Sequence, residues 1–315
     1  VGEPEGVRPS GFSMIGQTIN TGTANNNSGG GIARYGTGLD AGNIAIYTDG
    51  SADLGTLLMP IYWESVNAEG GAHSVGSITV AAGEDITLHA DLNFNDFGPR
   101  TGAGLGGDSL ENSTLHLIAG RNITLDGKIS DPILDGRDAL DIELEAGERL
   151  TLNKDISTSG GSISLEAGTE ITLGNVVTEG PCQENSPCVG NLTVRGRETS
   201  EGTSSPNISQ KDDSHLQIAG TTTIDIGAGI ATLNSSDNRF LGPINGVAQH
   251  LTVSGGDDGL TFGALTLTGN LTATATGNIT DITDGDADNI IRVDGLATLF
   301  RSVKTVCSSP AVHIS

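Results

Sequence analysis

Three aspartates spaced two residues apart are the first candidates for chemistry in this chain. They are Asp284, Asp286 and Asp288, in the segment TDGDADN. Short carboxylates that converge in a turn are ligands that calcium prefers, so the segment predicts a calcium site. An EF-hand would need glycine at Asn289 and glutamate at Gly295, so that full motif is absent. A plain acidic turn is the alternative.

Two of the three cysteines lie close together in PCQENSPC, as Cys182 and Cys188. A proline-bordered loop with this spacing predicts a local disulfide, which would form in an oxidising compartment. Two exposed free thiols are the alternative. Cys307 has no obvious partner.

A short motif of serine esterases occurs at Gly107–Leu110, where Ser109 would be the nucleophile. Asp212 and His215 would supply the downstream pair. That nucleophile requires a strand-to-helix turn, whereas Ser109 follows a glycine-rich loop and helical patterns are almost missing. We therefore interpret the match as coincidental.

Carboxylates that alternate with apolar residues are the remaining catalytic candidates. They are Glu143, Glu145, Glu166 and Glu170. Paired carboxylates perform acid–base chemistry in enzymes that cleave polysaccharides, but the alternation predicts a solvated strand face here. A carbohydrate-active protein, either an enzyme or a binding module, stays the alternative function. The six histidines show no metal-ligand spacing.

The only tryptophan, Trp63, lies beside Tyr62 in the most apolar stretch, LLMPIYWESV. A core strand or an end cap would bury both rings. An exposed aromatic platform for sugars is the alternative, so Trp63 and Tyr62 are the candidate binding residues.

The elements that position these residues follow from a unit that occurs four times between Ser77 and Thr178. Each copy has two alternating apolar segments around a small-residue turn, and the turn glycines are Gly83, Gly120, Gly147 and Gly168. The spacing between these glycines falls from 37 to 27 to 21 residues. Apolar residues two apart indicate strands with one buried face.

A unit this short cannot bury its own apolar face, so successive copies must stack. Equivalent strands then pair in parallel about 4.8 Å apart, and their inward residues form continuous aliphatic rows. The sequence therefore predicts an all-β fold, a parallel β-solenoid with loop insertions in a single elongated domain of roughly 12 to 14 coils.

We expect an irregular first segment over residues 1–31, which caps the first coil, and a solenoid over 32–300. Insertions are expected near 93–112, 130–139, 179–191 and 197–214, the last as a mobile loop or linker. Residues 301–315 break the period and are either a cap or a truncated coil.

Other polar repeats are interpreted as structural. The N-[IL]-T sequons, among them Asn122, Asn191 and Asn270, match a turn asparagine followed by a strand. Thr272, Thr274 and Thr276 suggest a flat hydroxyl array, but the units from Ser77 to Thr178 offer one Thr or Ser at each place.

The composition limits the partners. The net charge of −24 argues against binding to nucleic acid or to anionic membranes. No apolar run approaches the length of a membrane span, so no membrane-spanning segment is expected. Glycine is abundant, at 47 residues, and only 3% of residues are aromatic, as expected for many tight turns between β-branched strands.

The second half of the chain resembles a known family. It contains G-x-x-T, then TLN-x-x-x-NRF-x-G, then LTLTGNLTATATGNITD and a fresh V-x-G-x-A-T. This run is similar to the repeats of filamentous-haemagglutinin-type exoproteins and related large adhesins. The AGEDITL, AGRNITL and AGTEITL units resemble degenerate coils of the same family.

The resemblance implies a secreted, right-handed β-helix on a cell surface, used for adhesion or as a structural fibre. We accordingly expect an extracellular structural or adhesive protein. Its expected partners are host or cell-surface glycans, or other copies of itself stacked end to end, because an uncapped coil leaves backbone groups unpaired.

Overall fold

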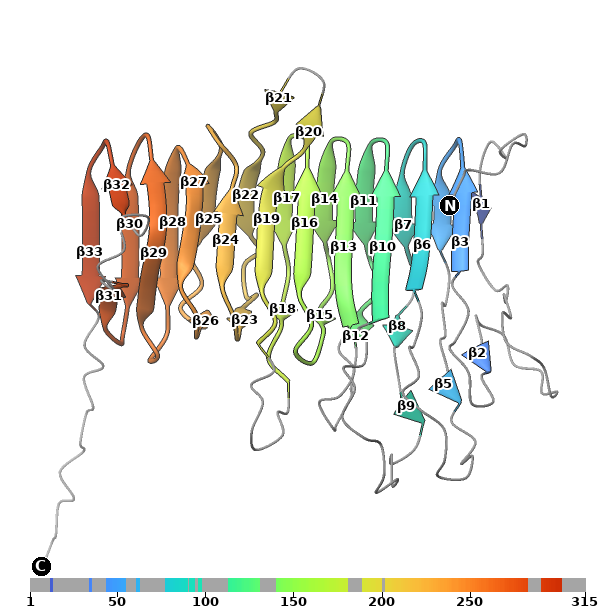
Figure 1. Cartoon of the computed structure of the whole chain (residues 1–315), viewed down its shortest axis with the longest axis horizontal. Coiled ribbons are helices and arrows are strands. Elements are labelled where there is room, and N and C mark those ends of the chain that lie inside the picture. Colours follow the sequence, from blue (N-terminus) through green and yellow to red (C-terminus); the bar gives the residue numbers. More distant parts are fainter. Residues whose placement is uncertain are drawn as a thin grey trace, which may run out of the picture.

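The strands of the chain stack into one elongated rod (Figure 1). The computed structural model describes residues 12–13, 34–35, 44–54, 61–62, 77–89, 91–93, 96–97, 113–130, 140–180, 189–199, 202–282 and 290–301. These ranges contain strands and turns but no helix. The chain advances one coil at a time along the rod, from β1 at one end to β33 at the other.

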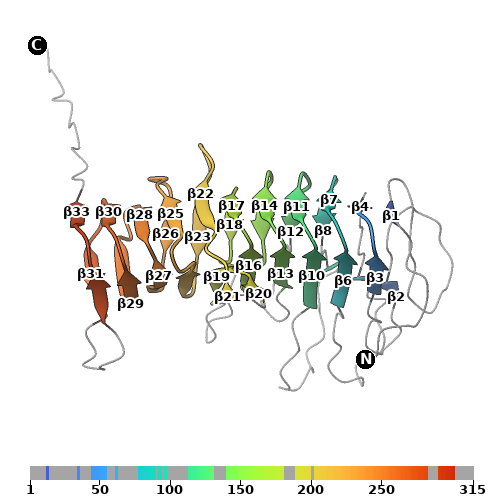
Figure 2. The same ribbon diagram turned by 90° about the horizontal axis from the view of Figure 1, so that it is seen from above.

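Two long sheets form the broad sides of the rod and lie one behind the other (Figure 2). The front sheet contains β3 (Ile44–Thr48), β6 (Ser77–Ala82), β10 (Ser113–Ala119), β13 (Leu140–Ala146), β16 (Ile163–Ala167), β19 (Leu192–Gly196), β24 (Thr222–Asp225), β27 (Ile244–Ala248), β29 (Leu260–Leu267), β31 (Ile279–Asp281) and β32 (Ile291–Val293). The back sheet contains β1 (Phe12–Ser13), β4 (Ala52–Leu54), β7 (Ile86–Leu88), β11 (Asn122–Leu125), β14 (Arg149–Leu152), β17 (Glu170–Leu173), β22 (Asn207–Gln210), β25 (Ile230–Leu233), β28 (His250–Gly255), β30 (Leu271–Ala275) and β33 (Ala297–Arg301).

Smaller sheets complete the fold. A narrow sheet closes one long edge of the rod and contains β8 (Leu92–Asn93), β12 (Ile129–Ser130), β15 (Ile156–Ser157), β18 (Val176–Val177), β23 (Leu216–Ile218) and β26 (Arg239–Phe240). A three-stranded sheet contains β2 (Arg34–Tyr35), β5 (Ile61–Tyr62) and β9 (Asp96–Phe97). The only antiparallel strand pair of the described residues is the hairpin of β20 (Glu198–Thr199) and β21 (Gly202–Thr203).

The chain is a right-handed parallel β-helix. Each front strand pairs in parallel with the front strand of the next coil, and the back and narrow sheets behave in the same way. The chain rises through the front sheet, crosses over the top and descends through the back sheet while it moves away from the first coil (Figures 1 and 2). The predicted solenoid is therefore confirmed.

The core is a set of aliphatic rows inside the rod. One row on the front sheet runs through Ile46, Val80, Leu117, Leu144 and Leu165, and each residue faces its equivalent in the next coil. Ile123, Leu152 and Ile171 on the back sheet are likewise fully buried. Burial of such rows is the main favourable term in the stability of the fold.

The glycine turns lie at the edge where the front sheet passes to the back sheet. A Cβ on Gly147 would overlap the carbonyl oxygen of Gly120, and a Cβ on Gly168 would overlap that of Gly147. The glycines therefore stack directly on one another from coil to coil. No side chain fits between the turns, which is why glycine marks the register of the repeat.

Turn asparagines connect successive coils. The Oδ1 atom of Asn191 accepts a hydrogen bond from the backbone N–H of Thr221 at 2.8 Å, and that of Asn270 accepts one from Leu296 at 2.9 Å. Each bond gives a backbone amide of the following coil a hydrogen-bond acceptor. A structural role of these sequon asparagines is therefore confirmed.

The long sheets contain eleven strands each along the described residues. One expectation differs from the structure. The range 197–214 is not only a loop, since β22 lies within it and pairs with β17 and β25. Its inward residues are Ile208 and Gln210, and because the glutamine interrupts the aliphatic alternation, the sequence pattern hides the strand.

Candidate functional surfaces

Most of the predicted site residues lie outside the described part of the chain. Asp284, Asp286 and Asp288 fall in 283–289, Cys182 and Cys188 in 181–188, and Trp63 directly follows β5. The calcium site and the disulfide therefore stay predictions. Ser109 is also outside the described residues.

Tyr62 is placed by its backbone alone. It lies in β5, whose register sets it opposite Tyr35 of β2 and Phe97 of β9. The three-stranded sheet thus has an aromatic residue at the same position of each strand. No sequence pattern predicted this alignment, because the three residues are separated by segments of different composition.

The described residues contain no group of three or more His, Cys, Asp or Glu side chains arranged to hold a metal ion. Nor do they include a helix long and apolar enough to cross a membrane.

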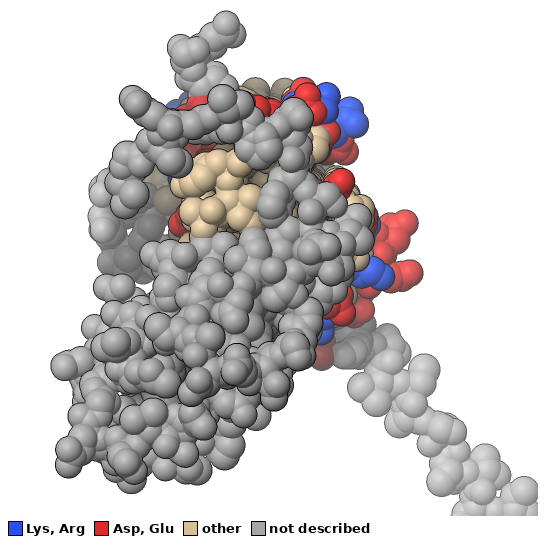
Figure 3. Space-filling view, turned by 90° about the vertical axis from the view of Figure 1, so that its right-hand side faces the viewer, with Lys and Arg blue, Asp and Glu red and all other residues tan. Residues whose placement is uncertain are grey.

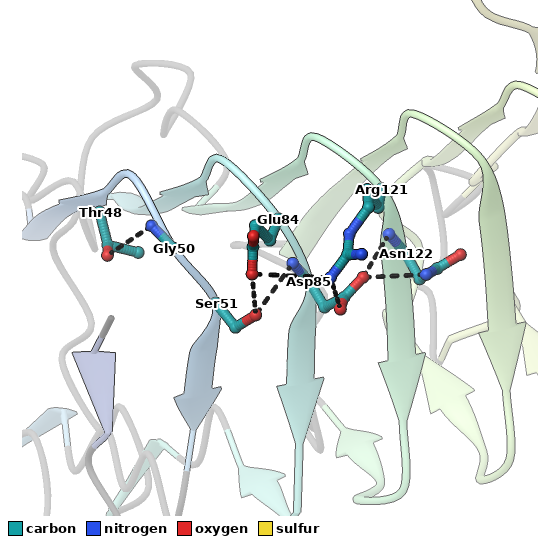
Figure 4. A network of polar contacts seen from close by, with 7 residues as sticks. All are labelled: Thr48, Gly50, Ser51, Glu84, Asp85, Arg121 and Asn122. Atoms are coloured by element: carbon teal, nitrogen blue, oxygen red, sulfur yellow. Dashed lines mark hydrogen bonds and ion pairs between the residues drawn. The ribbon is translucent and has the colours of Figure 1, made fainter. Parts of the chain in front are cut away.

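A polar network lies over the glycine turns near the first coils (Figure 4). Arg121 donates to the Asp85 Oδ2 atom at 2.7 Å and lies 3.5 Å from the Glu84 Oε2 atom. Asp85 Oδ1 also accepts from the backbone N–H of Asn122 at 3.1 Å. Ser51 extends the network to the preceding coil through its hydroxyl, which lies 3.3 Å from Glu84 Oε2. Because these side chains are largely exposed, the network adds little to the free energy of folding. Its role is to hold three successive coils in register.

A second network crosses the outer face of the front sheet. His116 Nε2 lies 2.9 Å from Glu145 Oε1, and Arg195 Nε donates to Glu166 Oε2 at 2.9 Å. Glu145 and Glu166 occupy paired positions on β13 and β16. Two neighbouring carboxylates are thus flanked by a histidine on one side and a guanidinium on the other.

The predicted solvated face is wrong for one of these carboxylates. Glu166 is only 8% exposed, whereas Glu170 is exposed and lies 3.7 Å from Arg149. A buried carboxylate requires a partner, and Arg195 supplies one. Because each carboxylate already has its own partner, we interpret the group as two cross-strand ties, one between β10 and β13 and one between β16 and β19.

A third network follows the narrow sheet. Arg239 Nη1 lies 2.6 Å from Glu179 Oε2, and its Nε lies 2.6 Å from Asp258 Oδ2. Gln217 donates to the same Glu179 oxygen. The hydrogen bond with Asp258 and, after it, that with Glu179 raise the pKa of Arg239 above its ordinary value. Residues of four successive coils are joined in this way.

The longest surface row lies on the outer face of the back sheet. One outward position carries a hydroxyl residue in nine successive coils, and every member is half-buried. The row consists of Thr87, Thr124, Thr151, Thr172, Ser209, Thr232, Thr252, Thr272 and Thr298. We call it the hydroxyl row.

The hydroxyl row could have been found from the sequence. Its signal is the middle residue of successive triplets, such as ITL at Ile86, LTL at Leu150 and ATL at Ala231. A search for two threonines in one coil misses it, because the repeat runs between coils. A single Thr or Ser at each place is enough for a continuous row.

Comparison with known proteins gives a repeat family and no function. Residues 185–246 and 248–303 match a family described as repeats of unknown function (DUF5649). The first segment contains β19 to β26 and the second contains β28 to β33. Neither the curated proteins nor the solved structures gave a match. The matched repeats and the stacked sheets agree on a β-solenoid repeat protein.

Proposed function

We propose that the protein is an extracellular rod that acts as a structural spacer and adheres through its back face. The observation that carries the proposal is the regularity of the rod, in which one surface position of the back sheet is a threonine or serine in nine successive coils. The resemblance to large secreted adhesins supports the same function. A face that repeats the same hydroxyl group from coil to coil suits contact with a ligand that is itself repetitive.

The rod is suited to a mechanical role. Each interior coil is hydrogen-bonded to the coil before and after it, and aliphatic rows join the coils inside. Bending the rod would break ladder bonds and open the core at the same time, so the stack resists deformation. The high negative charge keeps such a body soluble.

The hydroxyl row provides the adhesive chemistry. Each hydroxyl can donate one hydrogen bond and accept two. Within the described residues, the structure shows no side-chain hydrogen bond that uses these nine hydroxyls, so their bonding capacity faces solvent. A glycan presents hydroxyl groups along its whole length and can pair with such a row. We therefore propose an extended cell-surface polysaccharide as the ligand class.

Matched threonine variants test this proposal. The double variant Thr151→Val/Thr172→Val removes two central hydroxyls at nearly constant shape and should reduce binding to immobilised polysaccharides at least about 5-fold. The control Thr193→Val removes a hydroxyl from the front face and should bind as the wild type does. Equal binding by both variants would contradict adhesion through the back face.

Labelling of intact cells tests the location. An antibody raised against the purified rod should label cells of the source organism without permeabilisation. Labelling that requires permeabilisation would contradict an extracellular role.

A further inference from the structure

The two broad faces of the rod differ in charge. The back strands from β7 to β30 contain one acid, Glu170, and one base, Arg149, so their net charge is zero. The two side chains also lie beside each other, with Arg149 Nε at 3.7 Å from Glu170 Oε2. The front strands from β6 to β29 have a net charge of −4, from Asp141, Glu143, Glu145, Glu166, Asp225 and Arg195.

Other charges on the back side of the rod lie in the turns at the ends of the back strands. Asp85 and Arg121 lie over the glycine turns, and Asp212 and Asp213 lie in the turn that follows β22. Figure 3 views the rod along its axis from the first coils and shows acidic and basic side chains around its margin. In a protein with a net charge of −24, the uncharged back strands are a local exception.

An exposed apolar side chain lies beside the hydroxyl row. Ile230 of β25 is 40% exposed and is the only exposed large apolar residue in the described back strands from β7 to β30. It precedes Thr232 of the hydroxyl row by two residues, so both side chains point outward from the same strand. The register places Ile230 opposite His250 of β28. The back face therefore joins an apolar side chain and an imidazole ring to the row of hydroxyls.

His250 has one ring nitrogen in a structural bond and a proton on the other. Its Nδ1 atom accepts a hydrogen bond from the backbone N–H of Asn270 at 2.8 Å. A backbone amide can only donate, so the neutral ring carries its proton on Nε2. No hydrogen bond to Nε2 occurs within the described residues. His250 thus adds an N–H donor beside the outward hydroxyls of Thr252 and Ser254 on the same strand.

We propose that the back face from β22 to β30 is a binding site for an uncharged polysaccharide, whose chain lies along the rod axis. The inference rests on the proposed function and specifies its ligand. A sugar ring carries hydroxyl groups around its edge and C–H groups on its faces. The hydroxyls of Thr232 and Thr252 and the Nε2–H of His250 bind the sugar hydroxyls, while Ile230 packs against a C–H face.

Charge favours an uncharged glycan over charged polymers. A uronate or sulfate polymer requires cationic partners, and the only cation of these back strands, Arg149, already has Glu170 beside it. A basic polymer would be attracted to the front strands, which carry the net negative charge. An uncharged glycan requires neither, and its hydrogen-bonding groups match those of the back face.

Retention on matched polymers tests the charge of the ligand. Three immobilised neutral polymers, namely hydroxyethylcellulose, dextran and starch, are compared with carboxymethylcellulose, dextran sulfate and carboxymethyl starch. A neutral polymer that retains the protein should do so at least about 10-fold more strongly than its charged derivative. Added salt should leave this retention unchanged, because screening weakens only interactions between charges. Equal or stronger retention by the charged derivatives, or loss of retention in salt, would overturn the inference.

Two asparagine substitutions test the residues of the site. Asn207 precedes Ile230 by one coil, and its Oδ1 atom accepts a hydrogen bond from the N–H of Ile230 at 3.0 Å. By the same geometry, His250→Asn should keep the bond to Asn270 while it removes the ring and the Nε2–H donor. The double variant Ile230→Asn/His250→Asn should weaken binding to the retained neutral polymer at least about 5-fold. The control Val247→Asn replaces a 40%-exposed residue of the front face and should bind as the wild type does.

The variants also separate this inference from the proposed function. Weaker binding by Thr151→Val/Thr172→Val, together with unchanged binding by Ile230→Asn/His250→Asn, would leave adhesion through the back face standing and overturn this site. Retention by none of the six polymers would contradict both. Urea unfolding midpoints equal to that of the wild type show that a loss of binding does not come from unfolding.

Discussion

Two buried threonines differ in whether the hydroxyl has a hydrogen-bond partner. Thr222 lies in an inward row of the front sheet between Leu192 and Ile244, and its hydroxyl is buried without a hydrogen-bond partner. Thr158 is equally buried, but its hydroxyl donates to the Gly161 carbonyl at 2.6 Å. The same residue type therefore has opposite effects on stability at these two places.

Exchange of each threonine for valine measures this difference. Thr222→Val removes an unpaired buried hydroxyl at nearly constant shape and should raise the free energy of unfolding by about 1 kcal/mol. Thr158→Val breaks a satisfied bond and should lower it by about 1 kcal/mol. Urea unfolding with an unchanged m-value is the measurement. If both variants were destabilised equally, the hydroxyl of Thr222 would have a partner.

The amide pair Gln210 and Asn238 is a further polar exception in the core. Asn238 Nδ2 donates to Gln210 Oε1 at 2.9 Å, and Gln210 Nε2 donates to Asn238 Oδ1 at 2.8 Å. Asn238 Oδ1 also accepts from the backbone N–H of Leu216 at 2.8 Å. The pair is fully satisfied, so a glutamine can occupy an aliphatic row between Leu173 and Leu233.

At the scale of elements, the close contact between glycine turns determines which substitutions the repeat tolerates. The turns of successive coils are in direct backbone contact at Gly83, Gly120, Gly147 and Gly168. A methyl group there must push two coils apart, whereas a Cβ on Gly256 would have no atom nearer than 3.3 Å. The cost of a substitution therefore depends on the place of the glycine in the coil.

Two alanine variants measure that dependence. Gly147→Ala should lower the free energy of unfolding by more than about 3 kcal/mol, because its Cβ would overlap the Gly120 carbonyl oxygen. Gly256→Ala should cost less than about 1 kcal/mol, because its Cβ would lie 3.3 Å from the nearest atom, the Asn238 oxygen. The urea midpoints of the two variants provide the comparison. Similar midpoints would contradict close stacking of the turns.

The elements that could be predicted from the sequence are those with a local apolar period. The strands on both sides of Gly120 and Gly147 alternate strictly, so their pairing followed directly from the repeat. β22 was missed because its inward residues include Gln210, whose partner Asn238 lies a coil later. Glu166 was misplaced because its burial depends on Arg195, from another coil. A contact between two coils joins residues that are far apart in the sequence, so no local sequence pattern indicates it.

At the scale of the whole molecule, the rod is a one-dimensional stack with ends that differ from its middle. Interior coils have neighbours on both sides, whereas the last described coil has a neighbour on one side only. The stability of such a stack is a sum of coil and interface terms, so terminal coils open most easily.

Amide hydrogen exchange at low protein concentration measures this gradient. Amides of β13 and β14 should exchange most slowly, and those of β33 should exchange fastest among the ladder-bonded strands. Uniform exchange along the rod would indicate that it opens as one cooperative unit.

The corner between the narrow and front sheets has a practical consequence. β12 ends at Ser130 and β13 begins at Leu140, whereas β15 ends at Ser157 and β16 begins at Ile163, yet both pairs of strands stack in register. Connections of unequal length therefore fit at this corner. A longer loop adds little to the entropic cost of loop closure. A foreign peptide or an entire small domain could be grafted there, and the rod would carry it at a fixed height as a display scaffold.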